Sequence, residues 1–161
     1  MMQKLMLLSV FLLVLVACKK DPVDSGEQKP VIELLTNNSS KTWQVQDGVA
    51  KQGDLEVNLI ASQNPCVTDN QITLYSNFSY EFKEGATKCN PNDPDTILTA
   101  NWELAADESS ITIDRFVFLG RSVDNPTFTL SDVTENTFSG TTTVTLNNET
   151  FEITVIFESV N

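Results

Sequence analysis

The most reactive side chains in this chain belong to three cysteines, Cys18, Cys66 and Cys89. A thiolate can accept a lipid, form a disulfide or bind a soft metal ion, and its compartment and neighbouring ligands decide between these reactions. The sequence has no histidine, so it lacks the commonest general base and a frequent zinc ligand. We therefore expect lipid attachment or cross-linking of the cysteines, with a metal pair at Cys66 and Cys89 as the alternative.

Carboxylates are the other abundant reactive groups, with 22 Asp and Glu against 10 Lys and Arg and a formal net charge of −12. This balance repels nucleic acid, so we expect no nucleic-acid partner. Residues 90–95 hold Asn and Asp oxygens of the kind that Ca²⁺ binds, but Pro91 and Pro94 explain the same residues as turn formers. The sequence leaves calcium at this loop open, and we otherwise predict no metal and no cofactor.

Two pairs of acids have the residue types of a glycosidase site: Asp93 with Asp95, and Asp107 with Glu108. Both pairs lie in predicted surface turns, where no apolar wall would raise the pKa of the acid. The sequence contains no glycine-rich phosphate loop, and a histidine triad cannot be built from it. We therefore expect no catalytic residues and no enzymatic activity.

The first 17 residues have the three parts of a secretory signal, because Lys4 precedes an apolar run that ends on the small residue Ala17. The run is too short for a membrane-spanning helix, which needs about 20 residues. Residues 15–18, Leu-Val-Ala-Cys, resemble a bacterial lipobox. The resemblance implies that the signal peptide 1–17 is cleaved and that Cys18 carries the lipid as the first mature residue. The alternative is an ordinary secreted protein with Cys18 after the cleavage site by chance.

The lipobox resemblance also assigns a compartment. Lys19 is not the Asp that retains enterobacterial lipoproteins in the inner membrane, which implies an outer-membrane anchor with its face, periplasmic or cell-surface, undetermined. This compartment is oxidising, so Cys66 and Cys89 are expected to pair once Cys18 is assigned to the lipid. Residues 18–40 are expected to form a lipidated tether, in which 31–35 is either one helical turn or further linker.

Residues 41–161 are rich in Phe, Thr, Val and Ile and show the two-residue apolar period of strands. Polar turns are expected at Asp47-Gly48, at 76–79 and at Asn147-Asn148. Residues 116–119 either add an edge or cross the mouth of a barrel. The expected strands lie at about 41–46, 55–59, 72–74, 80–82, 99–104, 110–114, 128–130, 138–146 and 151–157. Eight or nine short antiparallel strands predict a sandwich or an up-and-down barrel.

Several motifs resemble the lipocalin-like lipoproteins of the Bacteroidota: Trp43, Cys66 and Asp69 before Ile72-Thr73-Leu74, Tyr80-Glu81-Phe82 before Gly85, Cys89, Asn101-Trp102-Glu103-Leu104 and Ile111-Thr112-Ile113. The resemblance covers about residues 41–114. It implies an all-β, eight- or nine-stranded lipocalin-like barrel over 41–161 and supplies no catalytic residues. Asp95-Thr96-Ile97 also resembles the O-glycosylation acceptor of that phylum, which implies a modification at Thr96.

One turn departs from the family pattern, because Asn77-Phe78 stands where Asp-Gly is common. Phenylalanine resists a positive φ, so we expect Asn77 to be the left-handed residue. Phe78 at this tip either packs on the barrel or serves as a contact residue.

Eight large side chains are expected on the interior face of the strands: Trp43, Tyr80, Phe82, Trp102, Phe128, Phe138, Phe151 and Phe157. They either fill the barrel completely or line a cavity for one small apolar ligand. We expect a non-enzymatic, lipid-anchored envelope protein that binds a small hydrophobic or amphipathic ligand in the barrel. The alternative is a structural or protein-interaction module of an outer-membrane assembly, with unknown protein partners.

Overall fold

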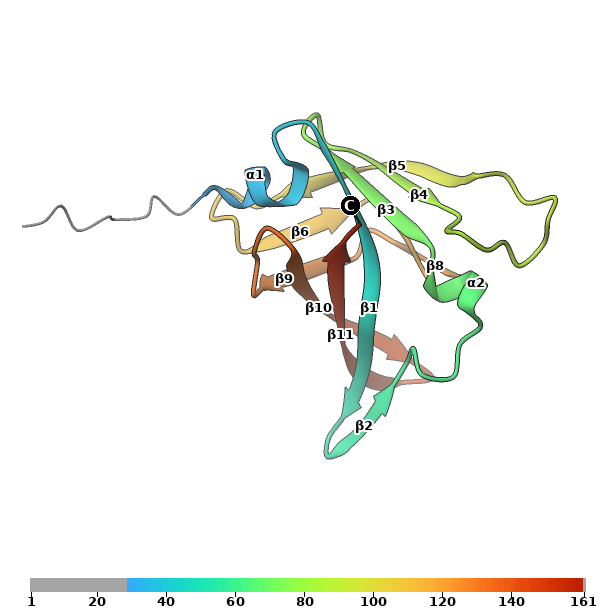
Figure 1. Cartoon of the computed structure of the whole chain (residues 1–161). Coiled ribbons are helices and arrows are strands. Elements are labelled where there is room, and N and C mark those ends of the chain that lie inside the picture. The colour runs from blue at the N-terminus through green and yellow to red at the C-terminus, as the bar shows by residue number, and fades with distance from the viewer. Residues whose placement is uncertain (1–28, 161) are drawn as a thin grey trace, which may run out of the picture.

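The computed structural model describes residues 29–160, which form a closed antiparallel barrel (Figure 1). The barrel strands, in their order around the ring, are β1 Ser40–Gln52, β3 Gln71–Tyr75, β4 Ser79–Lys83, β5 Thr96–Leu104, β6 Ser110–Ile113, β9 Thr127–Ser131, β10 Thr137–Leu146 and β11 Glu149–Ser159. The ring strands follow one another around the barrel in chain order, with β2, β7 and β8 inserted between them in the chain, and β11 closes the barrel on β1. The predicted all-β, up-and-down barrel is therefore confirmed.

Three segments lie outside the ring. Strand β2, Leu55–Asn58, pairs with the end of β1 as an extra strand. Strands β7 Arg115–Phe118 and β8 Arg121–Asp124 form a separate two-stranded sheet between β6 and β9. Helix α2, Pro65–Thr68, precedes β3. The segment predicted at 116–119 is thus half of a hairpin, and its Phe116 is buried against Phe128 at a ring distance of 5.1 Å.

Helix α1, Val31–Thr36, closes one end of the barrel. Its residues Leu35 and Thr36 are fully buried, and the indole Nε1 of Trp43 donates a hydrogen bond of 3.0 Å to the carbonyl of Leu35. The carboxylate of Glu108 accepts the first helical N–H, that of Val31, at 3.0 Å. The apolar turn at 31–35 is therefore a helix that packs with the folded body rather than further linker.

The predicted leader 1–17, Cys18 and the tether as far as residue 28 lie outside the described residues. Between residues 29 and 160, no helix is both long and apolar enough to cross a membrane.

Strand β1 is longer than predicted because Asp47-Gly48 is not a turn. The strand continues through these residues with a register shift between Val45 and Asp47 against β11. A Cβ on Gly48 would lie 3.2 Å from the ring of Phe118 and 3.4 Å from Ile60. The glycine therefore allows close packing and does not mark a turn.

Strand β2 is exposed at every position, although its alternating sequence predicts a half-buried strand. The strand pairs only with β1 residues 49–52, beyond the part of β1 that pairs with β3. No sheet lies opposite it in the described structure to bury its apolar side chains.

The tip of the β3–β4 hairpin contradicts the prediction that Asn77 is left-handed, because Phe78 has the positive φ of 65°. Asn77 instead accepts hydrogen bonds from the N–H and hydroxyl of Ser79 at 3.0 and 2.7 Å. The Phe78 ring lies 5.2 Å from that of Trp102, so the side chain packs on the barrel while remaining 44% exposed. This contact offsets the backbone cost of a non-glycine residue at positive φ.

We expect the Phe78→Ala variant to be less stable than the parent by about 1–2 kcal/mol, because it keeps the strained φ and loses the ring contact. The Phe78→Gly variant should recover about 1 kcal/mol relative to alanine, since glycine adopts positive φ freely. Urea denaturation measures both. At Glu103, an exposed residue within β5, the order should reverse, with glycine less stable than alanine. Equal stability of the two Phe78 variants would contradict the strain.

Candidate functional site

The barrel interior is filled by side chains. Of the eight predicted interior residues, seven are buried and Phe151 is only partly buried. The rings of Phe138 and Phe157 stack at 4.5 Å, and Trp43 meets Phe138 edge to face at 4.8 Å. A cavity inside the barrel, lined in part by Phe128, Phe138 and Phe157, has a volume of only about 10 Å³. A water molecule needs about 10–15 Å³, so the solid-core alternative describes this barrel and a ligand has no room inside it.

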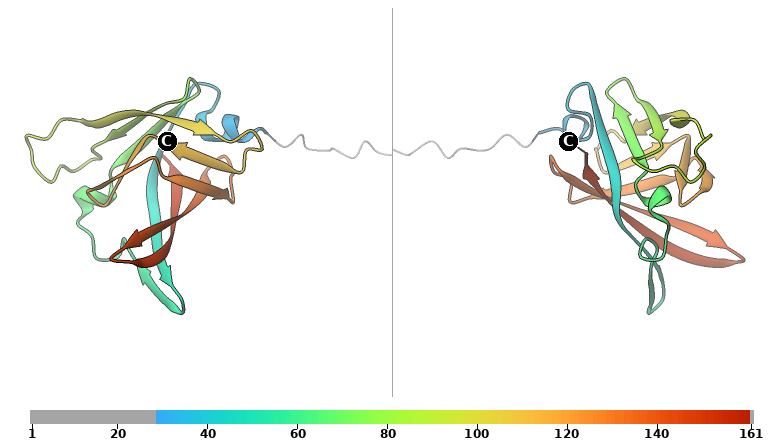
Figure 2. Two further views of the ribbon diagram at one scale, coloured as in Figure 1. Left: turned by 180° about the vertical axis from the view of Figure 1, so that it is seen from behind. Right: turned by 45° about the vertical axis from the view of Figure 1, so that its right-hand side comes forward.

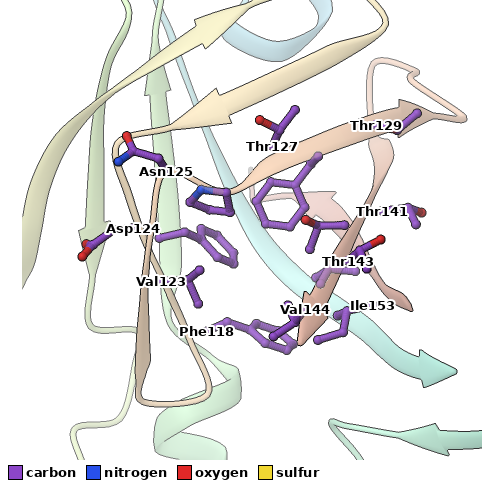
Figure 3. A pocket seen from close by; sticks show the side chains of 15 residues that line it. Phe118, Val123, Asp124, Asn125, Thr127, Thr129, Thr141, Thr143, Val144 and Ile153 are labelled. Atoms are coloured by element: carbon purple, nitrogen blue, oxygen red, sulfur yellow. The ribbon is translucent and has the colours of Figure 1, made fainter. Parts of the chain in front are cut away.

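An open pocket of about 530 Å³ lies instead at the end of the barrel away from α1 (Figure 3). One wall is the β7–β8 hairpin and the other is formed by strands β9, β10 and β11. Apolar side chains form the floor, and threonines with Asp124 and Asn125 form the rim. The lining includes Phe116, Phe118, Val123, Phe128, Val144 and Ile153 on the apolar side, and Thr127, Thr129, Thr141 and Thr143 on the polar side. We call this pocket the mouth groove.

The mouth groove exists because two neighbouring strands separate. Strand β9 pairs with β10 only where Thr129–Ser131 faces Ser139–Thr141, and the rest of β9 pairs with β6. Beyond Thr141, β10 continues with β11 alone. The pocket therefore depends on the unequal lengths of the barrel strands. The apolar periodicity of the sequence did not predict the pocket.

Three ring strands extend past the closed ring and, together with β2, form what we call the distal sheet, with β10 142–146, β11 149–154, β1 49–52 and β2 55–58 side by side. Figure 2 shows its two hairpins, teal and dark red, projecting from the barrel. The register places Val57, Ala50 and Ile153 in one row, on the face that continues the barrel interior. Leu55 and Val57 on this face are 58% and 48% exposed, so the distal sheet presents an uncovered apolar surface.

The disulfide between Cys66 and Cys89 is confirmed, with the two Cα atoms 5.1 Å apart. It joins α2 to the β4–β5 loop, and a cross-link over 23 residues stabilises by about 3 kcal/mol in the chain-entropy model. The same loop contacts Asp69, whose carboxylate accepts bonds from the N–H and hydroxyl of Thr87 at 2.8 and 2.7 Å. A Cβ on Gly85 would lie 2.0 Å from the carbonyl oxygen of Asp69, so only glycine fits there.

Three of the four acidic residues that resembled catalytic pairs, Asp95, Asp107 and Glu108, are engaged in local structure through their carboxylates. Lys88 donates to the carbonyl of Asp93 and pairs with the carboxylate of Asp95, both at 2.6 Å, which lowers the pKa of Asp95. Asp107 accepts bonds from Ser109, which lower its pKa, and Glu108 caps α1. In the part of the chain that the structure describes, no cluster of three His, Cys, Asp or Glu side chains could hold a metal ion.

Thr96 is the first residue of β5 and is exposed, at the edge of the disulfide-linked loop. The residue is therefore accessible to solvent, as a modification would require. The O-glycosylation implied by the sequence stays a prediction.

The fold and the site together define a closed β-barrel with a solid core and an open apolar groove at one end. Compared with known proteins, the chain matches no family model and no curated protein sequence. Two solved structures of mutant transferrin-binding protein B, a vaccine antigen from Haemophilus parasuis Hp5, show a distant similarity to this chain. The double mutant has 9% identity and a TM-score of 0.39 over 80% of this chain and 26% of that chain. The single mutant has 10% identity and a TM-score of 0.40 over 81% and 28%. This chain thus spans about a quarter of the length of those proteins.

The carboxyl of Glu84, beside the disulfide, should make the stability of the barrel depend on pH. Burial, and next the nearby charge of Asp93, raise the pKa of Glu84 above its usual value of 4.5. The folded state therefore holds this proton to higher pH than the unfolded chain, and stability is lost as pH rises from about 4.5 through the folded pKa.

We expect the Glu84→Gln variant to gain stability over the parent at pH 7 but not at pH 4, because it carries no charge at either pH. The gain should be below about 1 kcal/mol, since the side chain is partly exposed. Thermal unfolding at the two pH values measures it. The matched variant Glu103→Gln, at an exposed position of β5, should show no such difference between the two pH values. A gain for Glu84→Gln that is equal at pH 4 and pH 7 would contradict the raised pKa.

Proposed function

We propose that this protein is a non-enzymatic, lipid-anchored protein of the cell envelope that binds another protein through its open end. The filled interior of the barrel carries this proposal, because its internal cavity of about 10 Å³ is too small for a ligand, whereas the mouth groove and the distal sheet are accessible apolar surfaces. A groove open along one side and continuous with an uncovered sheet face suits a segment of polypeptide.

The direction in which the anchor holds the barrel supports this proposal. Helix α1 follows the lipobox cysteine in the chain and closes the end of the barrel opposite the mouth groove. The 11 residues from Cys18 to Lys29 can span at most roughly 40 Å. A lipid on Cys18 would attach the protein at the α1 end of the barrel, and the mouth groove at the far end would stay accessible to a partner.

The charge of the body agrees with this orientation. Residues 1–28 contain three cationic and three acidic side chains, so the net charge of −12 belongs entirely to residues 29–161. Anionic headgroups repel such a body, and the repulsion keeps the barrel off the membrane surface.

A small amphipathic ligand in the mouth groove is the second candidate. The groove volume of about 530 Å³ lies within the range of roughly 300–1,000 Å³ for small-molecule sites. Its apolar floor, with threonine hydroxyls at the rim, would suit a ligand with an apolar body and a polar head.

The Cys18→Ala variant should move from the membrane fraction to the soluble fraction and lose labelling by an alkyne-tagged palmitate fed to the cells. The parent should stay in the membrane fraction, because two or more acyl chains hold a protein almost permanently. A double variant with alanine at both Cys66 and Cys89 is the control and should remain in the membrane. Retention of the Cys18→Ala variant in the membrane would contradict the anchor.

A photoreactive amino acid at Val123, a groove residue that is 37% exposed, should form a covalent adduct with a specific protein in intact host cells. The same amino acid at Glu103 on the outer wall of the barrel is the control and should form none. Mass spectrometry identifies the adduct. If Val123 gives no protein adduct while native mass spectrometry of the same protein shows a bound small molecule, the second candidate replaces the first.

A further inference from the structure

Half of strand β10 has no partner on the side of the mouth groove. The strand pairs with β11 from Thr137 to Leu146 but with β9 only as far as Thr141. In residues 29–160, no strand occupies the open side of residues 142–146. This stretch of five residues is about the length of an ordinary strand.

The backbone of β10 directs hydrogen-bonding groups into this open side. The N–H of Ser159 donates to the carbonyl of Asn136 at 2.8 Å, which marks Asn136 as a residue that faces β11. Backbone groups alternate sides along an antiparallel strand, so the even-numbered residues of β10 face β11. Thr143 and Thr145 therefore turn their N–H and C=O groups toward the mouth groove.

The open edge lacks the features that usually prevent a strand from pairing with another chain. Natural sheets protect exposed edges with charged residues, with proline or by making the strand very short. Strand β10 contains no charged residue and no proline. The opposite edge of the distal sheet, β2, is protected, because Glu56 pairs with Lys51 at 3.1 Å and Asp54 lies beside it.

The side chains that line the mouth groove suit an extended strand paired with β10. Side chains of an extended segment alternate between two faces, so one row would point to the apolar floor and the other to solvent. Val123 and Phe118 of the hairpin form the wall opposite the edge, as Figure 3 shows. A strand in this position would form hydrogen bonds with the backbone groups of Thr143 and Thr145 and would at the same time cover the apolar floor.

Charge indicates what kind of segment fits. Among the residues that line the mouth groove, Asp124 is the one with an ionisable side chain, and Arg115 pairs with it at 2.8 Å. The surrounding body carries the net charge of −12, including Glu149 and Glu152 on the strand next to β10. Cationic side chains on the solvent row of a bound strand would therefore be attracted. A second copy of this chain would be repelled by its equal charge.

We propose that the open edge of β10 binds an extended, positively charged segment of a partner protein as an added strand. The segment pairs with the backbone of Thr143 and Thr145 and places every second, apolar side chain in the mouth groove. This inference rests on the proposed function, because it specifies how the protein partner is held.

The test uses a synthetic peptide of about ten residues in which lysine and valine alternate, added to the folded protein. We expect saturable binding in fluorescence anisotropy that weakens as salt rises, and binding at least tenfold weaker for the peptide with glutamate in place of lysine. The Thr143→Pro variant should lose at least tenfold in affinity, because proline removes the N–H that faces the open side and leaves the pairing with β11 intact. Thr143→Val keeps that N–H and should bind within about twofold of the parent.

A second measurement covers the case in which Thr143→Pro fails to fold. Two peptides N-methylated on opposite sets of alternate residues are added to the unmodified protein, and one set should lose binding while the other keeps it. Equal binding of the two methylated peptides, equal binding of the glutamate peptide, or no binding of any peptide overturns the inference. A concentration-dependent dimer of the parent that Thr143→Pro abolishes also overturns it, because a second copy then occupies the edge.

The Val123 adduct separates this inference from the proposed function. If the adduct forms in cells equally well with Thr143→Pro and with the parent, the protein interaction stands and the added strand is wrong. If Val123 gives no protein adduct at all, the proposed function itself fails.

Discussion

The pairing of β11 with β1 is the interaction on which the rest of this structure depends. It closes the ring and brings the two ends of the folded chain together, from Trp43 opposite Ser159 to Lys51 opposite Glu152. The two strands have 13 and 11 residues, whereas β3, β4, β6 and β9 have four or five. The closing strands therefore extend past the ring, where β2 pairs with the end of β1 and the end of β10 pairs with β11. The distal sheet and the mouth groove both follow from this mismatch in length.

Large aromatic side chains fill the interior of the closed ring. An eight-stranded barrel has an interior just wide enough to be filled by side chains. Two tryptophans, Tyr80 and several phenylalanines occupy it here, and burial of the Tyr80 hydroxyl raises its pKa, so the group stays neutral. Each buried ring contributes apolar area, and the edge-to-face contact of Trp43 with Phe138 adds directional packing. Accessible apolar surface is consequently found at the end of the barrel and not inside it.

The alternating apolar pattern was sufficient to predict eight or nine antiparallel strands and most of the core, because that pattern is a local property of each strand. The choice of a barrel over a sandwich came from the resemblance to lipocalin-like lipoproteins. The pattern failed where a distant contact decided the local structure. Glycine occupies position 48 within a strand because a Cβ there would crowd Phe118 and Ile60. Phe78 adopts a positive φ because its ring packs against that of Trp102. The cysteine pair was predictable from compartment and count. The mouth groove was not, because it depends on the residue at which β9 leaves β10, and no motif marks Thr141.

The acidic surface of the protein compensates for the unprotected edge of β10. An exposed strand without charges would normally pair with other copies of itself. Here the net charge of −12 makes two copies repel each other, so the whole surface does what gatekeeper residues on the strand would otherwise do. Because long-range repulsion keeps two copies apart, β10 needs no charged residue of its own, and its backbone N–H and C=O groups stay available for pairing. In the proposed complex the same field would also make the edge selective, because it repels an identical acidic chain and attracts a cationic one.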